Sequence, residues 1–420
     1  MPNAFYNAWD MEQPEAASRD YRTPFRRNRD RLIHNAAFRR LQGKTQVFLS
    51  GEYDFYRTRL THSIEVAQIS GSIGQFLNHT SAPLGPDFHI DPDLCEAVAL
   101  AHDIGHPPFG HAGEGTLHRL MTPYGGFEGN AQTLRLVGET IYTSGGDRRG
   151  LNPTRALVDG VLKYKTLWGE VPDQRNHFLY TGQRRFLDFI TDGRPWPDDL
   201  GCGKPRNGFR SLECQIMDWA DDTAYSLNDV VDGVHAGFIT LGRVQRWAEE
   251  HARPEEREAV DDLLDALRHG TIERTMNRRI GRFVEGVRLV ERENFLSDLS
   301  HRWRFGIEVA DTVRLEQKLF NRIAVDLVFR SPQVCQLEHK GDFMLTRLWT
   351  TLVDHYLPHG KPRLALLSPD FEREIGRPEL DAAGRARVLC DYLAGMTDGF
   401  ASRIYKRLFD ADFGSIVDLV

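Results

Sequence analysis

The strongest constraint on the fold of this chain is a helix whose start and end are both set by the local residues. Asp91 is a favourable N-cap residue, Pro92 suits the first helical position, and apolar residues follow at helical spacing. The two prolines at 107–108 cannot continue a helix. The helix is therefore expected to end just before them, which places His102 and Asp103 in its last turn.

The stretch 101–114 concentrates residues that bind metals or transfer protons. It holds three histidines and two carboxylates in fourteen positions. The adjacent pair His102 and Asp103 can offer an imidazole nitrogen and a carboxylate oxygen to one metal ion, or to two neighbouring ions. His106, His111 and Glu114, expected on the turn after the helix, would then lie close enough to move protons beside the metal. Such a cluster is typical of a metal-dependent hydrolase.

Two distant segments offer matching ligands. His62 lies near the start of an earlier helix, and Asp221 lies within a later one, where Asp221, Tyr225 and Asp229 are spaced to share one face. Two imidazoles and two carboxylates with open positions suit Mn²⁺, Fe²⁺, Co²⁺ or Mg²⁺ better than a structural zinc. Such a metal polarises a phosphoryl oxygen and lowers the pKa of bound water. Taken alone, His62 is more often a core histidine and Asp221 part of a solvated helix face, and it is the cluster at 101–114 that favours a site.

The rest of the chain predicts an all-α fold, a helical bundle with a C-terminal helical extension. Strand-like alternation is scarce, residues 191–210 read as a surface loop, and no internal repeat or linker is visible. Helical spacing recurs over 60–77, 130–142, 211–235, 254–269, 280–298, 307–330, 343–356, 384–395 and 398–409.

Composition narrows the class of protein. The chain of 420 residues is 40% hydrophobic and 27% charged, with a net charge of −7, which is ordinary for a globular protein. No signal sequence and no apolar run of about 18 residues is present, so no membrane association is expected. The five cysteines are scattered without a Cys-x-x-Cys spacing and read as reduced core thiols. A cytoplasmic protein is the expectation.

These motifs resemble the HD-superfamily phosphohydrolases, in which a His…His-Asp…Asp pattern binds metal. More narrowly, the chain is similar to the bacterial deoxyguanosinetriphosphate triphosphohydrolases (dGTPase-like dNTPases). The His-Asp pair alone is a weak signal, but an ordered series of matching segments is specific. They lie at 29–34, 37–42, 44–48 (ending at Phe48), 58–63, 101–114, 127–132, 162–164, 220–226 and 391–398.

The resemblance implies a role for each candidate residue. His62, His102, Asp103 and Asp221 would hold the metal. His111 would lie against the α-phosphate and help water attack it, oriented by Glu114, and His106 would also face the phosphates. The residues expected to bind substrate are Arg59 and Lys163 at the phosphates, Tyr225 and Asp229 at a deoxyribose with no room for a 2′-hydroxyl, and Gln46, Asn130 and Glu338 near sugar or base.

The reaction implied is hydrolysis of a dNTP, with dGTP first among them, to deoxynucleoside and tripolyphosphate. The resemblance also implies a homo-oligomer, a hexamer in relatives, with a regulatory dNTP or single-stranded DNA at subunit interfaces. It divides the chain into a basic arm and helix (1–58), an HD phosphohydrolase core (59–235) and a helical C-terminal region packed on the core (236–420). The alternatives are another HD-type nucleotide phosphohydrolase or phosphodiesterase, and a non-catalytic nucleotide- or DNA-sensing regulator. The intact ligands and the His111–Glu114 pair argue against the regulator.

Two features leave questions open. Many relatives carry histidine where this chain has Gly129, so a proton for the leaving oxygen must come from His111, His106 or metal-bound water. Basic residues also crowd the N-terminal stretch, either as a polyanion site or as partners for carboxylates within the fold. They are Arg19, Arg22, Arg26, Arg27, Arg29, Arg31, Arg39, Arg40 and Lys44.

Overall fold

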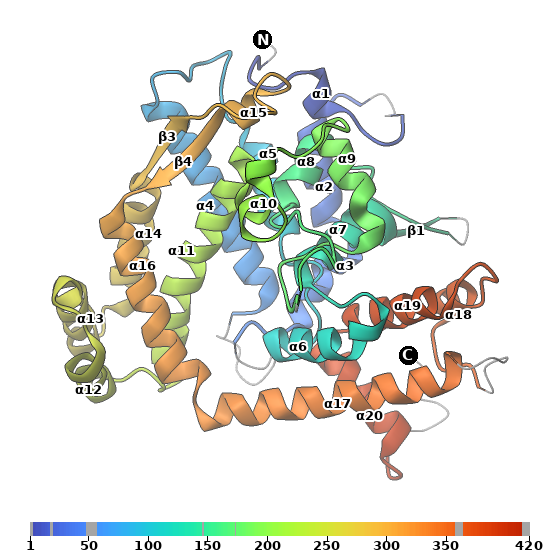
Figure 1. The fold of residues 1–420 in the computed structure, drawn as a ribbon. Coiled ribbons are helices and arrows are strands. Elements are labelled where there is room, and N and C mark those ends of the chain that lie inside the picture. The colour runs from blue at the N-terminus through green and yellow to red at the C-terminus, as the bar shows by residue number, and fades with distance from the viewer. Residues whose placement is uncertain are drawn as a thin grey trace.

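The computed structural model describes residues 3–16, 20–47, 57–144, 147–172, 174–357 and 364–413, and it confirms the all-α prediction (Figure 1). Arg19 and Phe48 lie outside these residues. The helices of the first half are α1 (Ala8–Met11), α2 (Pro24–Ile33), α3 (Ala36–Arg40), α4 (Arg59–Thr80), α5 (Pro92–Ala101), α6 (Gly110–Met121), α7 (Gly129–Arg135), α8 (Arg155–Val161), α9 (Arg184–Thr191) and α10 (Lys204–Gly208). Those of the second half are α11 (Leu212–His235), α12 (Leu241–His251), α13 (Arg257–His269), α14 (Ile272–Glu285), α15 (His301–Arg304), α16 (Asp311–Ala324), α17 (Pro332–Tyr356), α18 (Pro369–Ile375), α19 (Ala382–Ala394) and α20 (Asp398–Phe409).

Two short antiparallel sheets complete the fold within the described residues. One pairs β1 (Tyr142–Ser144) with β2 (Asp147–Arg149), and the other pairs β3 (Val287–Glu291) with β4 (Phe305–Val309). α7 and α16 each continue into a π-helical segment, η3 (Leu136–Thr140) and η7 (Val325–Phe329).

The helices that carry the site begin where the local sequence supplies caps. The Thr58 side chain accepts from the backbone N–H of Thr61 and the Thr61 side chain accepts in return, so α4 starts with a capping box. Asp91 caps α5 through the backbone N–H groups of Asp93 and Leu94. Both helices pack against each other and against α11, which brings three distant segments together at the centre of the molecule (Figure 1).

The apolar side chains form two cores. The larger one gathers residues of α2, α4, α5, α8, α11, α14 and α16. The smaller one lies between α6, α17, α19 and α20, along the lower edge of the molecule in Figure 1. Cys95, Cys214 and Cys390 are buried free thiols, whereas Cys202 and Cys335 are exposed, so only three of the five are core thiols.

Several sequence-based boundaries were wrong. Residues 106–114 are not one turn, because α6 begins at Gly110 and puts His111 and Glu114 on its first turns. The helix expected at 280–298 ends at Glu285, and residues 287–291 form β3, whose Val287 pairs with Val309 of β4. The helix expected at 307–330 likewise starts as strand. Gly286 ends α14, and the β-branched residues that follow suit a strand that is half covered by its neighbours.

No helix in the described part of the chain is long and apolar enough to cross a membrane.

Candidate active site

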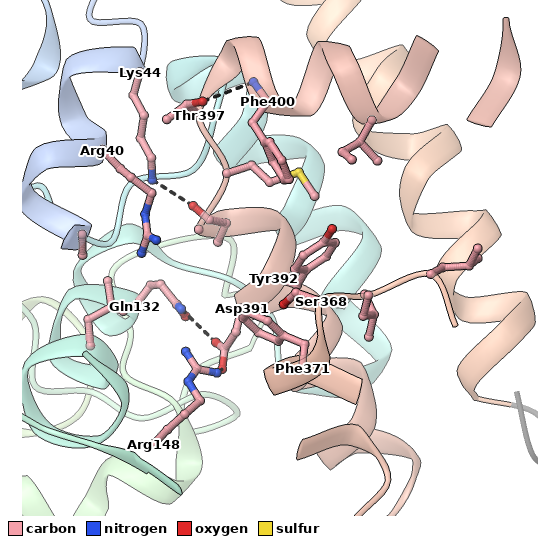
Figure 2. Close-up of a pocket in the computed structure, with 18 of the residues that line it drawn as sticks. Arg40, Lys44, Gln132, Arg148, Ser368, Phe371, Asp391, Tyr392, Thr397 and Phe400 are labelled. Carbon is pink, nitrogen blue, oxygen red and sulfur yellow. Dashed lines mark hydrogen bonds and ion pairs between the residues drawn. The ribbon is translucent and has the colours of Figure 1, made fainter. Parts of the chain in front are cut away.

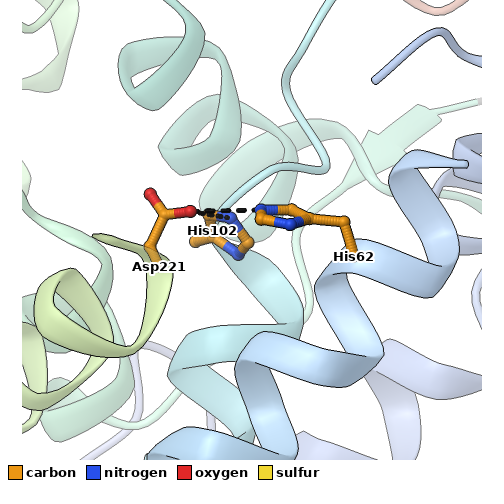
Figure 3. A group of neighbouring side chains, drawn as sticks. All are labelled: His62, His102 and Asp221. Atoms are coloured by element: carbon orange, nitrogen blue, oxygen red, sulfur yellow. Dashed lines mark hydrogen bonds and ion pairs between the residues drawn. The ribbon is translucent and has the colours of Figure 1, made fainter. Parts of the chain in front are cut away.

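Three helices bring two imidazoles and a carboxylate together at the centre of the fold (Figure 3). His62 lies in the first turn of α4, His102 directly follows α5, and Asp221 lies in the middle of α11. One ligand atom of each residue lies within 4.8 Å of the others. Nε2 of His62 is 3.1 Å from Oδ1 of Asp221, and Nε2 of His102 is 3.7 Å from the same oxygen.

His102 is oriented as a metal ligand. Its Nδ1 lies 2.6 Å from the carbonyl oxygen of Ala99, which makes Nδ1 the protonated nitrogen and leaves Nε2 with a free lone pair. That Nε2 is buried and has no hydrogen-bond partner among the described residues. This unpartnered Nε2 faces the imidazole of His62 and the carboxylate of Asp221. A divalent cation that takes both nitrogen and oxygen ligands would bind all three groups. The residues present therefore fit a metal ion.

Asp103 faces the same group from its edge. Its Oδ1 lies 3.6 Å from Nε2 of His102, while its Oδ2 accepts a hydrogen bond of 2.6 Å from Nη1 of Arg59. Arg59 is itself buried and donates through Nε to the carbonyl of Thr45, and its Nη2 has no partner in the described part of the chain. One oxygen of Asp103 is thus free toward the imidazoles, and one donor of Arg59 is free for an anion.

The electrostatics keep both carboxylates ionised. Burial alone would raise the pKa of Asp221, but His102, His62 and Lys163 outweigh burial and lower it well below its ordinary value. Burial also opposes ionisation of Asp103, and Arg59 and His102 again reverse the direction. Asp103 and Asp221 therefore both present a negative charge to the two imidazoles.

A second cluster lies on the loop and helix that follow His102. Oε2 of Glu114 is 3.4 Å from Nδ1 of His111 and 3.8 Å from Nε2 of His106, and the two imidazole centroids are 5.2 Å apart. The His111 side chain is 68% exposed, whereas His106 is buried. Burial and the charge of Arg59 lower the pKa of His106 to about 3, so His106 is neutral at pH 7. Of the two histidines, the exposed His111 is the one that reaches an incoming ligand and solvent.

Glu114 is held from the other side by the start of α7. Its Oε1 accepts a hydrogen bond of 2.8 Å from the backbone N–H of Gly129. A Cβ atom at position 129 would lie 3.0 Å from that oxygen and 3.9 Å from Cδ2 of His106. A side chain at position 129 would thus point at this cluster, and glycine leaves room beside it.

The expected row on α11 is present, since Asp221, Tyr225 and Asp229 lie on one continuous helix. The Tyr225 ring stacks on Phe329, with centroids 5.8 Å apart and planes 2° from parallel. Asp229 is buried, its Oδ2 has no partner among the described residues, and burial raises its pKa well above the ordinary value. Asp229 is therefore a buried acid with an unused hydrogen-bonding oxygen one turn from Tyr225.

The remaining predicted residues lie around these two clusters. Nζ of Lys163 is 2.6 Å from Oδ1 of Asp218 and 3.9 Å from Oδ2 of Asp221, so Lys163 is already ion-paired beside the ligand group. Asn130 donates to Oε1 of Glu128 at 2.9 Å. Gln46 and the exposed Glu338 line a small hollow of about 50 Å³ together with His111 and Phe329. A larger cavity of about 930 Å³ opens on the other side of His111 and Glu114.

Sequence reasoning missed two groups that shape the site. Asp218 pairs with Lys163 and with Arg210, and only its position one helical turn before Asp221 could have indicated it. Glu128 caps α7 and is buried next to Glu114, and burial together with that neighbouring charge raises its pKa. The matching segment at 127–132 contains Glu128, but nothing in the sequence assigned it a contact.

Comparison with known proteins places the chain in a family. Residues 59–139 match the HD domain, and residues 307–407 match the phosphohydrolase-associated domain. The "Deoxyguanosinetriphosphate triphosphohydrolase-like protein" of Shewanella loihica is 32% identical over the whole of both chains. The protein of that name from Haemophilus influenzae is 33% identical over 93% of each chain, and the "Deoxyguanosinetriphosphate triphosphohydrolase-like protein 2" of Deinococcus radiodurans is 32% identical over 98% of each. With its ligand group inside the matched HD domain and α11, the chain belongs to the deoxyguanosinetriphosphate triphosphohydrolase-like family of HD-domain proteins.

Proposed function

We propose that this protein hydrolyses deoxynucleoside triphosphates, dGTP first among them, to deoxynucleoside and tripolyphosphate. Water would attack the α-phosphorus and the 5′-oxygen of the sugar would leave. The observation that carries the proposal is the placement of His62, His102 and Asp221, with the unpartnered Nε2 of His102 among them, next to the cluster of His106, His111 and Glu114, in a chain of this family.

The metal would be held by His62, His102 and Asp221, with Asp103 as a fourth ligand through its free Oδ1. The donor set is compatible with Mn²⁺, Mg²⁺, Co²⁺ or Fe²⁺. When bound, such an ion supplies Lewis-acid polarisation of a phosphoryl oxygen and acidifies coordinated water.

The chain's own cations would neutralise the phosphates. The buried Nη2 of Arg59 has no partner in the described residues and lies beside the Asp103 carboxylate. Lys163 lies within 3.9 Å of Asp221 and would exchange part of its pairing with Asp218 for a phosphate oxygen. Positive charge at this point stabilises a transition state in which negative charge grows on the phosphoryl oxygens.

His111 would carry the proton that the reaction moves. It is exposed to the cavity beside it, and Glu114 accepts from its ring at 3.4 Å and orients it. Glu114 is kept ionised because the hydrogen bonds from His111 and from the backbone N–H of Gly129 outweigh its burial and lower its pKa. His106, neutral at pH 7, would serve as a hydrogen-bonding neighbour of the phosphates.

Discrimination of the sugar would come from α11. A deoxyribose packed on the Tyr225 ring would place its 3′-hydroxyl toward the unused oxygen of Asp229. A 2′-hydroxyl would meet the ring, so ribonucleotides would be rejected by exclusion. Gln46, Asn130 and Glu338 would complete the sugar and base contacts from the surrounding hollows.

The wider expectations are part of this proposal. The protein would work in the cytoplasm as a homo-oligomer, a hexamer by analogy with the family, and would bind a regulatory dNTP or single-stranded DNA at its subunit interfaces. The division at residues 58 and 235 into arm, HD core and C-terminal region remains a prediction.

The test is a product assay on the four dNTPs and GTP with Mn²⁺ or Mg²⁺, using the wild type, Asp221→Ala and Asp222→Asn. Asp222 is the adjacent carboxylate on α11 and lies outside the ligand group, so it is the matched control. Tripolyphosphate and deoxynucleoside should form with the wild type and the control and not with Asp221→Ala. The ranking of rates gives the base preference.

Other products would refute the proposal in distinct ways. Release of pyrophosphate and a monophosphate would indicate a different HD phosphohydrolase. No hydrolysis of any nucleotide, alone or with other dNTPs added as activators, would favour a nucleotide-sensing regulator.

A further inference from the structure

A cavity of about 800 Å³ lies apart from the site described above (Figure 2). It is bounded on one side by α3, the loop before α6 and α7, and on the other by α18, α19 and α20. None of the proposed metal, catalytic or substrate residues lines it. Its volume falls within the range that small-molecule sites occupy, about 300–1,000 Å³.

One side of this cavity carries two guanidinium groups, those of Arg40 and Arg148, and among the described residues only that of Arg148 is paired with carboxylates, those of Asp391 and Glu374. Other members of the basic N-terminal stretch pair with carboxylates, as Arg22 does with Asp30 and Arg29 with Glu96. Arg40 has no hydrogen bond or ion pair within the described residues and extends into the cavity. Desolvation in the cavity and the charges of Arg148 and Arg39 lower its pKa. The unpaired guanidinium of Arg40 is therefore the group on this wall that is open to a phosphate or carboxylate.

The other side is aromatic. The rings of Phe371, Tyr392 and Phe400 line it, and Figure 2 shows them on the side opposite Arg40. Phe371 and Tyr392 are edge-to-face at 5.1 Å, and the guanidinium of Arg148 lies 5.0 Å from the Phe371 ring centroid. Aromatic rings next to a guanidinium group suit a ligand with a flat ring that bears a negative group.

The cavity also touches the backbone of the proposed active site. Lys44 and Gly105 form part of its wall. Nζ of Lys44 donates to the carbonyl of His106 and to that of Ala394. The N–H of Gly105 donates to Oγ1 of Thr133, which donates in turn to the carbonyl of His102. The cavity wall is therefore connected to the backbone of His106 by one hydrogen bond and to the backbone of His102 by two.

We propose that this cavity binds a small anionic ligand with a flat ring, and that its occupancy changes the rate at the neighbouring active site. Arg40 would hold the phosphate or carboxylate, and Phe371, Tyr392 and Phe400 would hold the ring. The effect on rate rests on the proposed hydrolysis, whereas the binding site itself does not.

Binding is tested by calorimetry on the full chain with phenyl phosphate, benzoate and inorganic phosphate as probes. The variants are Arg40→Ala and its neighbour Arg39→Ala, whose guanidinium donates to the carbonyl of His34 and lies outside the cavity wall. Phenyl phosphate should bind saturably and more tightly than inorganic phosphate. It should bind at least about tenfold more weakly to Arg40→Ala, because a charge-assisted contact is lost. Arg39→Ala should bind like the wild type. Benzoate tells whether a carboxylate satisfies Arg40 as well as a phosphate does.

Phe371→Leu gives a second, independent variant, since it keeps apolar volume and removes the ring. It should weaken phenyl phosphate and leave inorganic phosphate unchanged. No saturable binding of any probe, or binding that Arg40→Ala leaves intact, would overturn the site.

The coupling is tested by the rate of dNTP hydrolysis with and without saturating phenyl phosphate. A change of twofold or more in the wild type that disappears in Arg40→Ala would support it. Binding without any change in rate would overturn the regulatory part. Binding by a protein that hydrolyses no dNTP would contradict the proposed function and leave the binding site standing.

Discussion

Asp391 is the carboxylate that ties the C-terminal helices to the helix beside the active site. Its side chain is fully buried and accepts from Nη2 of Arg135 at 2.8 Å, from Nη1 of Arg148 at 3.1 Å and from the Gln132 amide at 2.9 Å. Gln132 and Arg135 belong to α7, whose first residue, Gly129, holds Glu114 in place. Replacing Asp391 by asparagine keeps the shape and removes the charge.

The size of the effect follows from the pKa of Asp391. Burial would raise it, but Arg135 and Arg148 outweigh burial and lower the pKa to about 2. The ordinary value is near 3.8, and each pH unit corresponds to about 1.4 kcal/mol, so the charged form contributes about 2 kcal/mol to the free energy of unfolding at pH 7. Because the folded-state pKa is the lower one, this contribution is complete above about pH 4.5 and is lost as the pH falls toward 2. About 1 kcal/mol of it should be gone at pH 3.

The assay is urea unfolding followed by circular dichroism at pH 7, 5 and 3. The wild type should exceed Asp391→Asn by about 2 kcal/mol or more at pH 7 and 5, and this difference should narrow by about 1 kcal/mol at pH 3. Asp370→Asn is the control, since the Asp370–Arg373 pair is more than half exposed and should change stability by less than about 0.5 kcal/mol at each pH. A difference between wild type and Asp391→Asn that stays constant from pH 5 to pH 3 would refute the assignment of the stabilisation to the ionised carboxylate.

Three further predictions concern the active site. Asp221→Asn should weaken Mn²⁺ binding, measured by electron paramagnetic resonance, by more than about tenfold while the circular dichroism spectrum is unchanged, because one of three clustered ligands loses its charge; equal affinity would remove Asp221 from the ligand group. Gly129→Ala should lower kcat roughly threefold to tenfold at unchanged Tm, because its Cβ would lie 3.0 Å from Oε1 of Glu114 and displace that carboxylate; an unchanged kcat would show that the position of Glu114 is not critical. Tyr225→Ala should reduce the ratio of kcat/KM for dGTP over GTP by at least about tenfold, and a ratio that survives would mean that another residue excludes the 2′-hydroxyl.

Three of the four proposed metal ligands were accessible to sequence reasoning because their local context marks them. His102 and Asp103 lie at the end of a helix that Asp91 caps and that the prolines at 107–108 terminate. Asp221 shares a helical face with Tyr225. A polar residue at the end of a helix, or in a row on one helix face, can be recognised from the sequence without knowledge of its tertiary contacts.

The partners of those residues were not accessible, because they depend on how distant segments pack. Arg59 was predicted to bind phosphate, and in the structure one of its nitrogens holds Asp103, 44 residues away. Lys163 was predicted to do the same and is paired with Asp218. No spacing rule connects such residues, since salt bridges between elements follow from tertiary contacts alone.

Strands β3 and β4 were missed for a related reason. Residues 287–291 follow directly on α14, and their apolar positions continue a helical pattern as well as they begin a strand. What decides between the two is the partner strand at 305–309, which supplies the hydrogen bonds. Short apolar runs are ambiguous until the pairing is known.

The loop between His106 and His111 is held in a strained shape by the opposite end of the chain. Phe109, two residues before His111, adopts a left-handed backbone conformation with φ of 64°, which costs about 1–3 kcal/mol for a residue with a side chain. Its N–H donates at 2.9 Å to Oδ1 of Asp398, and the other oxygen of Asp398 accepts from the backbone N–H of Thr45. Its side chain packs on Gly341 so closely that a Cβ there would lie 2.8 Å from the Cβ of Phe109. The geometry of the site therefore depends on α17 and α20 as well as on the HD domain.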